Sequence, residues 1–535
     1  MSKKTFLSGA AVLGAAGLIV QMMGAVFRIP LANIIGDVGM GYYQTAYPVY
    51  IFLLVFSTNG APAAISKMIS ERVAAGRAAE ARRVFKLSFV VMLVFGLVAC
   101  GGLFAFAAPL AHFVKSEGSY YSLLAIAPSL LFVPLMSVFR GYFQGMQEMR
   151  PTAVSQLVEQ AIRVAVGLSL AVFLVSDSLE LASAGACFGA SVGPPAGILI
   201  LLVMYTRRRR EGGRARDGST GAGSDAGERA GGILRTLIVL IVPTTIGISI
   251  LPVMNVVDML ICRIRLTDAG FGVLEAEGLY GLMTGFAAPI INIPMALALS
   301  IALSMVPAVA AARGAGDGNF LDTNIRMGLR TAMIIGMPCS FGLIILSEPI
   351  LRLIYPAQPI ASDAAPCLAI LGAGVVFLCV AQAMAGILQG LGRASLPVVS
   401  LLAGVAVKFA LTYMLTALPA LNINGAALGS TAGYAVIGFL NLVFVKRSAG
   451  VRFDIVLSVV KPLAAGLLMC LVTAAVYFAC ALFTSGRLAA LTAICAAGLS
   501  YVIAILKSGA VMADEVALLP KGKALAALLR KLRLL

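Results

Sequence analysis

Five ionisable residues lie inside long apolar segments of this 535-residue chain, namely Arg28, Glu159, Arg163, Asp258 and Lys408. An ionisable side chain at the centre of a bilayer costs on the order of 2.5–3.5 kcal/mol even on the lenient insertion scale. Each of the five therefore needs a partner or contact with water. Two kinds of chemistry are consistent with such residues: the binding of a charged substrate, and ion pairs that hold helices together.

Spacing along the chain suggests a structural pair. Glu159 and Arg163 are one helical turn apart on a single helix face, so they can pair with each other, and a structural role is favoured for them. Lys408 matches Arg163 in the repeat described below, but Gly404 stands where the matching carboxylate would be.

Arg28 is more readily explained by function. Its one opposing charge within plausible reach is Asp258; each lies late in the first apolar span of its half, so a direct ion pair is possible. Lys67 ends the second span and adds a cation, while Asn255 and Asn292 supply uncharged hydrogen-bonding groups. These five residues predict a cavity richer in cations than in anions. Such a cavity suits a substrate with phosphate or carboxylate groups, because arginine binds them through paired donors.

The segments that carry these residues predict an all-α polytopic membrane protein. Hydrophobic residues make up 60% of the chain and charged residues 12%. The apolar runs reach about 20 residues or more, enough for a helix to cross a bilayer. We expect about fourteen transmembrane helices, at 6–35, 41–66, 84–110, 120–142, 153–176, 184–206, 233–262, 277–306, 325–347, 362–388, 395–417, 424–445, 458–482 and 486–508.

Enzyme chemistry finds little support in the sequence. The nine cysteines fall singly inside apolar segments and the chain has one histidine, so neither a metal site nor a disulfide is expected. The GxSxG, HExxH and phosphate-loop motifs are absent, and no paired carboxylates stand out. The sequence therefore predicts a transporter with no catalytic residue, no metal and no cofactor.

An internal repeat organises the spans. The stretch 138–163 recurs without a gap as 383–408, and both copies end on a cation. Because duplicated halves are common in transporters, spans 1–6 are expected to correspond to spans 7–12, with two spans added. Each repeat has an even number of spans, which predicts a pseudo-two-fold axis along the membrane normal. The motif residues are Arg140, Gly141, Gln144 and Gly145 in the first copy and Gln389 and Gly390 in the second.

The predicted domains follow from this repeat and from composition. They are an N-lobe at 1–206, a flexible basic linker at 207–232, a C-lobe at 233–447, two further helices at 448–508 and a cytoplasmic amphipathic tail at 509–535.

Basic residues predict the orientation in the membrane. Most of the 40 lysines and arginines fall in segments that are cytoplasmic when both termini are cytoplasmic. The predicted outside loops hold few, among them Arg263 and Arg265. The arginines of 207–232 are expected to bind anionic phospholipids. This arrangement accounts for the net charge of +17, so nucleic-acid binding is not expected.

Four stretches resemble a known family. They are RIPLANIIGDVGMGYYQTAYPVY (28–50), GAPAAISKMISE (60–71), RGYFQGMQEMRPTAVSQLVEQAIRV (140–164) and GLYGLMTGFAAPIINIPMALALSIALSMVPAV (278–309). They are similar to the oligosaccharidyl-lipid branch of the MOP flippase superfamily. Within it they resemble the stage V sporulation protein B group, which is related to the lipid II flippases of peptidoglycan synthesis.

The resemblance implies a fold and a role. The fold is two six-helix lobes in a V around a central cavity, plus two helices, in a bacterial plasma membrane. Family members flip undecaprenyl-pyrophosphate-linked sugars by alternating access, so the implied partners are such a lipid-linked oligosaccharide and the cell-wall synthesis machinery. The resemblance implies that Arg28 and Lys67 are cavity cations that act on the substrate. It implies a cavity role for Asp258 more weakly. The sequence departs from many relatives at Asn33, where they have a second basic residue.

Other functions stay open at the level of sequence. The same fold also serves exporters of small cationic drugs, which need buried carboxylates to hold a cation. Here Glu159 and Asp258 each have a basic residue nearby, which disfavours that function. A flippase for another polysaccharide lipid intermediate is a closer alternative. A membrane scaffold or an integral glycosyltransferase is disfavoured by the in-span charges and by the lack of acid/base clusters on the outer loops.

Overall fold

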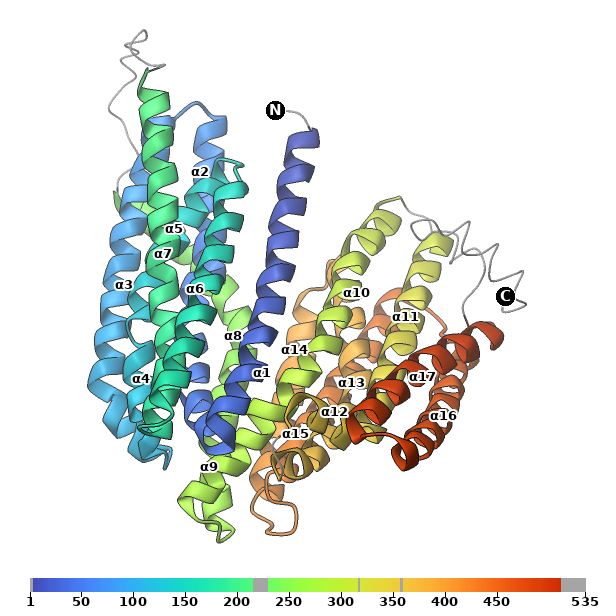
Figure 1. The fold of residues 1–535 in the computed structure, drawn as a ribbon. Helices are drawn as coiled ribbons and strands as arrows, with labels where there is room; N and C mark the ends of the chain where they lie inside the picture. Colours follow the sequence, from blue (N-terminus) through green and yellow to red (C-terminus); the bar gives the residue numbers. More distant parts are fainter. Residues whose placement is uncertain (1–2, 215–229, 316–317, 357–358, 511–535) are drawn as a thin grey trace. The chain divides into compact units, whose positions relative to one another are not determined.

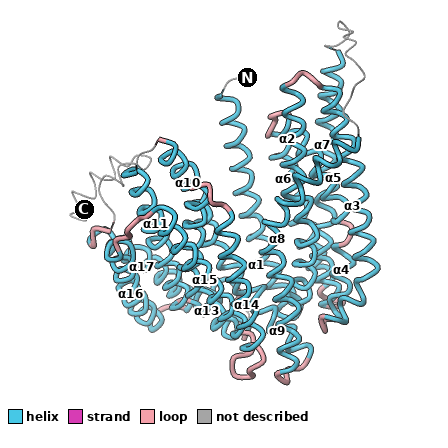
Figure 2. The backbone as a smooth tube through the Cα atoms, turned by 180° about the vertical axis from the view of Figure 1, so that it is seen from behind, coloured by secondary structure: helices cyan, strands magenta, loops and turns pink. Residues whose placement is uncertain are grey.

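The computed structural model describes residues 3–214, 230–315, 318–356 and 359–510. In these ranges the chain forms helices joined by turns and loops, without a strand (Figure 2). Twelve helical segments among the described residues are long and apolar enough to cross a membrane. One of them, Ile19–Val55, contains two helices that meet at a kink, and the 39-residue helix α8 is not among the twelve. The prediction of an all-α polytopic membrane protein is confirmed, and the predicted count of about fourteen spans is approximate.

The kink divides the first long helix, α1 (Lys3–Val55), at Gly36. Gly36 has φ 67° and ψ −167°, a combination that is essentially restricted to glycine. The two parts of α1 correspond to the first two predicted spans, 6–35 and 41–66. A π-helical turn at Phe56–Gly60 then leads into α2 (Ala61–Ala74).

Contacts between residues group Met1–Ile264 and Gly272–Gly281 into a first compact unit. Besides α1 and α2 it contains six complete helices and most of α8 (Figure 1). These are α3 (Ala78–Phe113), α4 (Tyr120–Ile126), α5 (Ser129–Gly145), α6 (Arg150–Leu174), α7 (Leu179–Arg214), α8 (Ala230–Asp268) and α9 (Val273–Gly281).

The second unit comprises Arg265–Phe271 and Leu282–Leu535. Its helices are α10 (Ala288–Gly314), α11 (Gly318–Ile345), α12 (Ser347–Ile354), α13 (Ile360–Gly390), α14 (Ser395–Leu415), α15 (Asn424–Ala449), α16 (Lys461–Phe483) and α17 (Gly486–Lys507). The last two pack on α11, where the Tyr501 hydroxyl donates to the Ile334 carbonyl oxygen at 2.9 Å.

The compact units and the predicted lobes divide the chain at different places. Most of α8 and all of α9 group with the first unit, whereas the predicted C-lobe begins at 233. The predicted lobes therefore stay a prediction. Most of the predicted linker 207–232 and of the predicted tail 509–535 lies outside the described residues.

The repeat is visible in the hairpins α5–α6 and α13–α14. Because α5 ends at Gly145 and α13 at Gly390, Gln144 and Gln389 lie at equivalent turns. Three residues after each glutamine the backbone takes a positive φ, 59° at position 147 and 70° at position 392. In both turns the amide nitrogen of that residue donates to the glutamine carbonyl oxygen at 2.9 Å.

The motif glycines allow close helix packing. Gly141 and Gly145 of α5 face α2, and a Cβ at Gly145 would lie 2.8 Å from a backbone oxygen of that helix. The matching Gly386 and Gly390 of α13 face α10, where a Cβ at Gly390 would lie 2.7 Å from a backbone oxygen. Each pair is a small-xxx-small motif, which brings membrane helices together backbone to backbone.

The correspondence extends to the next helix of each unit. Gly193 of α7 packs against the backbone oxygen of Glu159, and Gly433 of α15 packs against that of Gly404. Since 404 is the position that matches 159, α6–α7 and α14–α15 use the same packing. The duplication is therefore seen in how the helices pack against each other as well as in the sequence.

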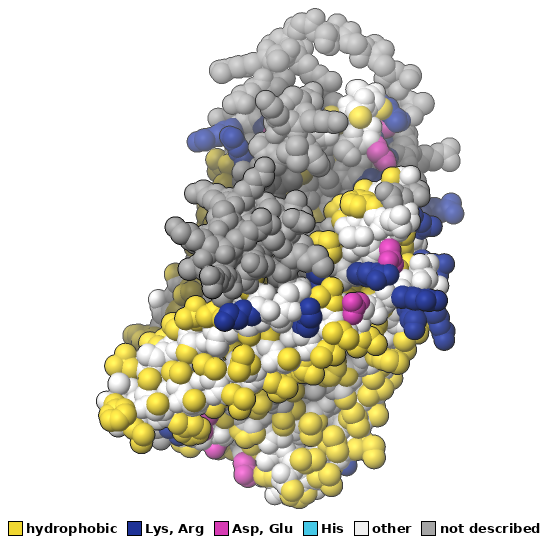
Figure 3. Space-filling view, turned by 90° about the vertical axis from the view of Figure 1, so that its right-hand side faces the viewer, with side chains coloured by type: hydrophobic (Ala, Val, Ile, Leu, Met, Phe, Trp, Pro, Cys, Tyr) yellow, Lys and Arg dark blue, Asp and Glu magenta, His cyan; other side chains and the backbone are white. Residues whose placement is uncertain are grey.

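Apolar side chains cover the face of the last two helices (Figure 3). Leu471, Phe478, Leu482 and Phe483 of α16 are all strongly exposed. A soluble protein rarely exposes so many large apolar side chains together, so this face suits contact with lipid.

Candidate functional site

Two arginines of the first unit lie over one tyrosine ring. Arg28 comes from the first part of α1 and Arg163 from α6, and Tyr47 lies on the second part of α1. The guanidinium carbon is 5.3 Å from the ring centroid for Arg28 and 5.4 Å for Arg163. Both distances fall within the range of a cation–π interaction. All three residues are half-buried.

A series of tyrosines fixes the position of this ring. Tyr43 stacks on Tyr47 with centroids 5.7 Å apart, and the ring of Tyr50 is tilted against that of Tyr47 with centroids 5.8 Å apart. Tyr43 and Tyr50 are only 2% and 4% exposed. The kink at Gly36 turns the chain so that the two parts of α1 bring Tyr47 and Arg28 together.

The structure gives Glu159 a different partner from the expected one. Its Oε2 lies 2.7 Å from Arg140 of α5, and Nε of Arg140 donates to Oγ of Ser155 at 3.1 Å. The expected Glu159–Arg163 pair is therefore wrong. Arg140 from the neighbouring helix meets the carboxylate directly, while Arg163 extends toward Tyr47.

The remaining predicted residues lie in several places. Lys67 of α2 is exposed and pairs with Glu71 at 4.0 Å, whereas Asp258 of α8 is buried. Asn255 is exposed on α8, also in the first unit. Asn292 is half-buried on α10 of the second unit, and Lys408 is buried on α14 beside Gly433. A single cavity that contains the five predicted cavity residues stays a prediction.

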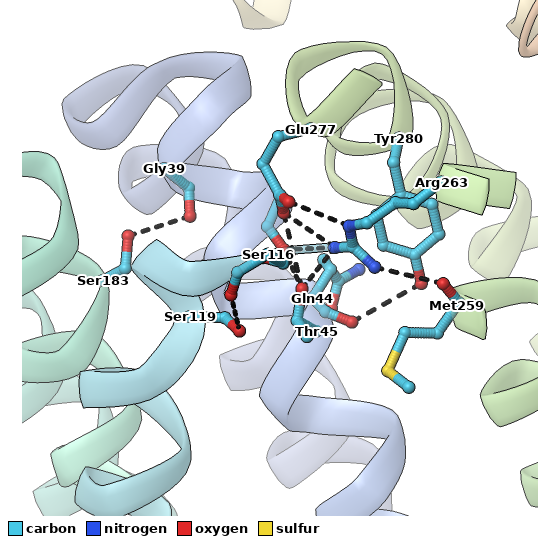
Figure 4. A network of polar contacts seen from close by, with 11 residues as sticks. Gly39, Gln44, Thr45, Ser116, Ser119, Ser183, Met259, Arg263, Glu277 and Tyr280 are labelled. Carbon is cyan, nitrogen blue, oxygen red and sulfur yellow. Dashed lines mark hydrogen bonds and ion pairs between the residues drawn. The ribbon is translucent and has the colours of Figure 1, made fainter. Parts of the chain in front are cut away.

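Sequence reasoning missed a buried ion pair. Arg263, assigned to an outside loop, lies within α8 and is 1% exposed, as is its partner Glu277 of α9. Its Nε and Nη2 donate to the two carboxylate oxygens at 2.8 and 2.7 Å (Figure 4). Its guanidinium also donates to Thr45 Oγ1 and to the Gly41 carbonyl oxygen of α1, the latter at 3.1 Å.

The same arginine packs on an aromatic ring. Its guanidinium carbon is 4.1 Å from the centroid of Tyr280, and Nη1 donates to the Met259 carbonyl oxygen at 3.2 Å (Figure 4). The network therefore joins α1, α8 and α9 within the first unit, with every guanidinium nitrogen bonded. This is a reason why α8 and α9 group with that unit.

A sequence signal could have found this arginine. The tetrapeptide Arg-Ile-x-Leu occurs at 28–31 and again at 263–266. Leu31 and Leu266 are both fully buried, which supports the match between the two segments. Arg263 thus matches Arg28 in the second copy of this tetrapeptide, but among the described residues a carboxylate is bonded to Arg263 and not to Arg28.

Comparison with known protein families gives two matches. Residues 6–313 match the family described as polysaccharide biosynthesis protein. Residues 283–414 match the family named MatE.

Two curated proteins of Bacillus subtilis (strain 168) are similar over most of their length. Stage V sporulation protein B is 27% identical over 449 residues, which cover 84% of this chain and 85% of the relative. Lipid II flippase MurJ is 29% identical over 471 residues, which cover 85% of each chain.

A solved structure is similar in fold. The lipid II flippase MurJ in an inward closed conformation superposes with a TM-score of 0.68 at 15% identity. The match covers 92% of this chain and 98% of the flippase. At this identity the likeness supports the fold.

Proposed function

Because the chain belongs to the polysaccharide biosynthesis protein family of the MOP flippase superfamily, we propose that it flips an undecaprenyl-pyrophosphate-linked oligosaccharide. The proposed substrate is the peptidoglycan precursor lipid II. It would move from the inner to the outer leaflet of a bacterial plasma membrane by alternating access. The similarity to a protein named lipid II flippase supports this substrate.

One observation carries the proposal: Arg28 is a half-buried cation inside a membrane helix, and no carboxylate among the described residues forms an ion pair with it. A cation in that position costs free energy unless an anion or water compensates it. A diphosphate brings about two negative charges, and a guanidinium offers it paired donors. Lys67, mostly exposed on α2, is proposed to assist.

Export of small cations is less well supported. That function needs a carboxylate free to bind a cation, but Glu159 is bonded to Arg140 and Glu277 to Arg263. The MatE match covers 283–414, whereas the two arginines over Tyr47 lie outside that range. The surplus of cations around Tyr47 favours an anionic substrate.

The proposal includes the orientation and the partners. Both termini are placed in the cytoplasm, with the basic linker at 207–232 against anionic phospholipids and the cell-wall synthesis machinery as the recipient of the flipped lipid. Neither catalytic residues nor a cofactor form part of this transport function.

The test is depletion of the protein in its host, followed by analysis of lipid-linked intermediates. We expect an undecaprenyl-pyrophosphate-linked sugar to accumulate in the inner leaflet, and its mass identifies the head group. A host with redundant flippases has to be depleted of those as well. Unchanged lipid-linked intermediates in such a strain would overturn the proposal.

A further inference from the structure

We infer that Arg163 is a second anion-binding residue, and that Arg28 and Arg163 together bind the diphosphate of the lipid across Tyr47. The inference rests on the proposed function and deepens it, because it distinguishes a diphosphate from a monophosphate. Sequence reasoning favoured a structural pair with Glu159 for Arg163, and the structure removes the basis for that pair.

The geometry fits two phosphates. Both guanidinium carbons lie within 5.4 Å of the same ring centroid, so they are at most about twice that distance apart. Charge-assisted hydrogen bonds from guanidinium to phosphate span about 2.8 Å. Two guanidinium groups this close can each hold one phosphate of a diphosphate, whereas a single phosphate needs only one of them.

The charges of Arg28 and Arg163 also support the binding of a diphosphate. Arg163 has no ion pair with a carboxylate among the described residues, because the nearest acidic residue on its helix, Glu159, is bonded to Arg140. Two cations over one ring repel each other, and the electron-rich face of Tyr47 offsets only part of that cost. A ligand with about two negative charges would neutralise both.

The surrounding helices hold this pair in place. Gly193 and Gly189 of α7 pack against the backbone oxygens of Glu159 and Arg163, which leaves α6 little freedom to move. The rings of Tyr43 and Tyr50 both contact the ring of Tyr47. Tyr47 is therefore a positioning residue, and the two arginines are the groups that touch the ligand.

The second unit has the same helix frame but not the same site. Lys408, at the position that matches Arg163, is 8% exposed and packs against Gly433 of α15. A lysine offers a point charge in place of the planar fork of an arginine. The first unit thus has a guanidinium group at this position, whereas the second unit has an ammonium group.

The test compares two ligands with the full-length protein in lipid nanodiscs. Binding of undecaprenyl diphosphate and of undecaprenyl monophosphate is measured by native mass spectrometry, and the readout is the ratio of the two dissociation constants. We expect the wild type to prefer the diphosphate on the order of tenfold or more, as one added hydrogen-bonded ion contact implies. Arg163→Gln should lose that preference, while Arg163→Lys should keep part of it.

Matched variants separate binding from structure. Arg83→Gln removes an exposed arginine of α3 and should keep the preference. Tyr47→Phe keeps the ring and should keep most of the preference, whereas Tyr47→Leu should reduce it. If Arg163 has a purely structural role, Arg163→Gln should weaken the binding of both lipids equally and leave the ratio of the two dissociation constants unchanged. That result would overturn this inference but not the proposed function. A wild type that binds neither lipid would overturn the proposed function as well.

Discussion

Arg28 and Arg263 occupy the same place in a duplicated Arg-Ile-x-Leu motif, yet their surroundings differ. Arg263 is fully buried and bonded to Glu277, Thr45 and a backbone oxygen. Arg28 is half-buried over Tyr47. One copy of the motif therefore lies in a buried ion-pair network, whereas the other provides the cation that we propose binds the substrate.

At the residue scale, Arg28→Ala should abolish complementation of a strain that lacks lipid II flippase activity, with membrane insertion intact. Arg28→Lys should recover only part of it, because an ammonium lacks the planar fork. The measurement is growth after depletion at matched expression, with Arg83→Ala as the control. Wild-type growth with Arg28→Ala would show that Arg28 is not required for substrate binding.

The buried pair allows a second residue-scale prediction. Glu277→Ala leaves the charge of Arg263 buried without its carboxylate, which should reduce the free energy of unfolding by about 3–5 kcal/mol. The double variant Arg263→Met/Glu277→Leu removes both charges and should recover most of that loss. Thermal unfolding of the purified proteins measures the difference. A double variant less stable than the single one would contradict this account.

At the scale of elements, glycines allow the close packing of the repeated hairpins. Gly141 and Gly145 in α5, and Gly386 and Gly390 in α13, lie at crossings where another helix backbone replaces the missing side chain. The repeated stretch stands out in the sequence by its length and by its identical residues. Its glycines and its turns at Gln144 and Gln389 have a structural explanation in both copies.

A substitution at such a crossing should separate the helices. Gly390→Leu places its Cβ 2.7 Å from a backbone oxygen of α10, and a backbone atom cannot move aside as a side-chain end can. We expect a much lower yield of monodisperse protein by size-exclusion chromatography. Gly498→Leu on α17, where a Cβ meets nothing within 4 Å, is the matched control. Equal yields for the two variants would show that the crossing tolerates a side chain.

At the scale of the whole molecule, the arrangement of basic residues predicts which loops face the cytoplasm. The loops between α6 and α7 and before α9 are expected outside, and the turn between α2 and α3 inside. Ala75 and Asp177 lie in two of these turns and Glu275 lies in the first turn of α9, and all three are exposed. Each can therefore report its side of the membrane without disturbing a packed helix.

Cysteine labelling tests this orientation. In a variant without the nine native cysteines, a membrane-impermeant maleimide should label Asp177→Cys and Glu275→Cys in intact cells but not Ala75→Cys. All three should react after the membrane is made permeable. Labelling of Ala75→Cys alone in intact cells would reverse the predicted orientation.

The sequence by itself determined the helical class, the approximate spans, the duplication and the family resemblance. These follow from hydropathy and from local motifs. Contact with lipid requires long apolar segments, and backbone geometry requires particular residues at local positions along the chain. Tertiary structure alone decided which charges meet. Glu159 and Arg163 have the right spacing to pair, but Arg140 on the preceding helix, α5, forms the ion pair with the carboxylate. Such partners depend on how each helix is rotated against its neighbours, which spacing within one helix does not specify.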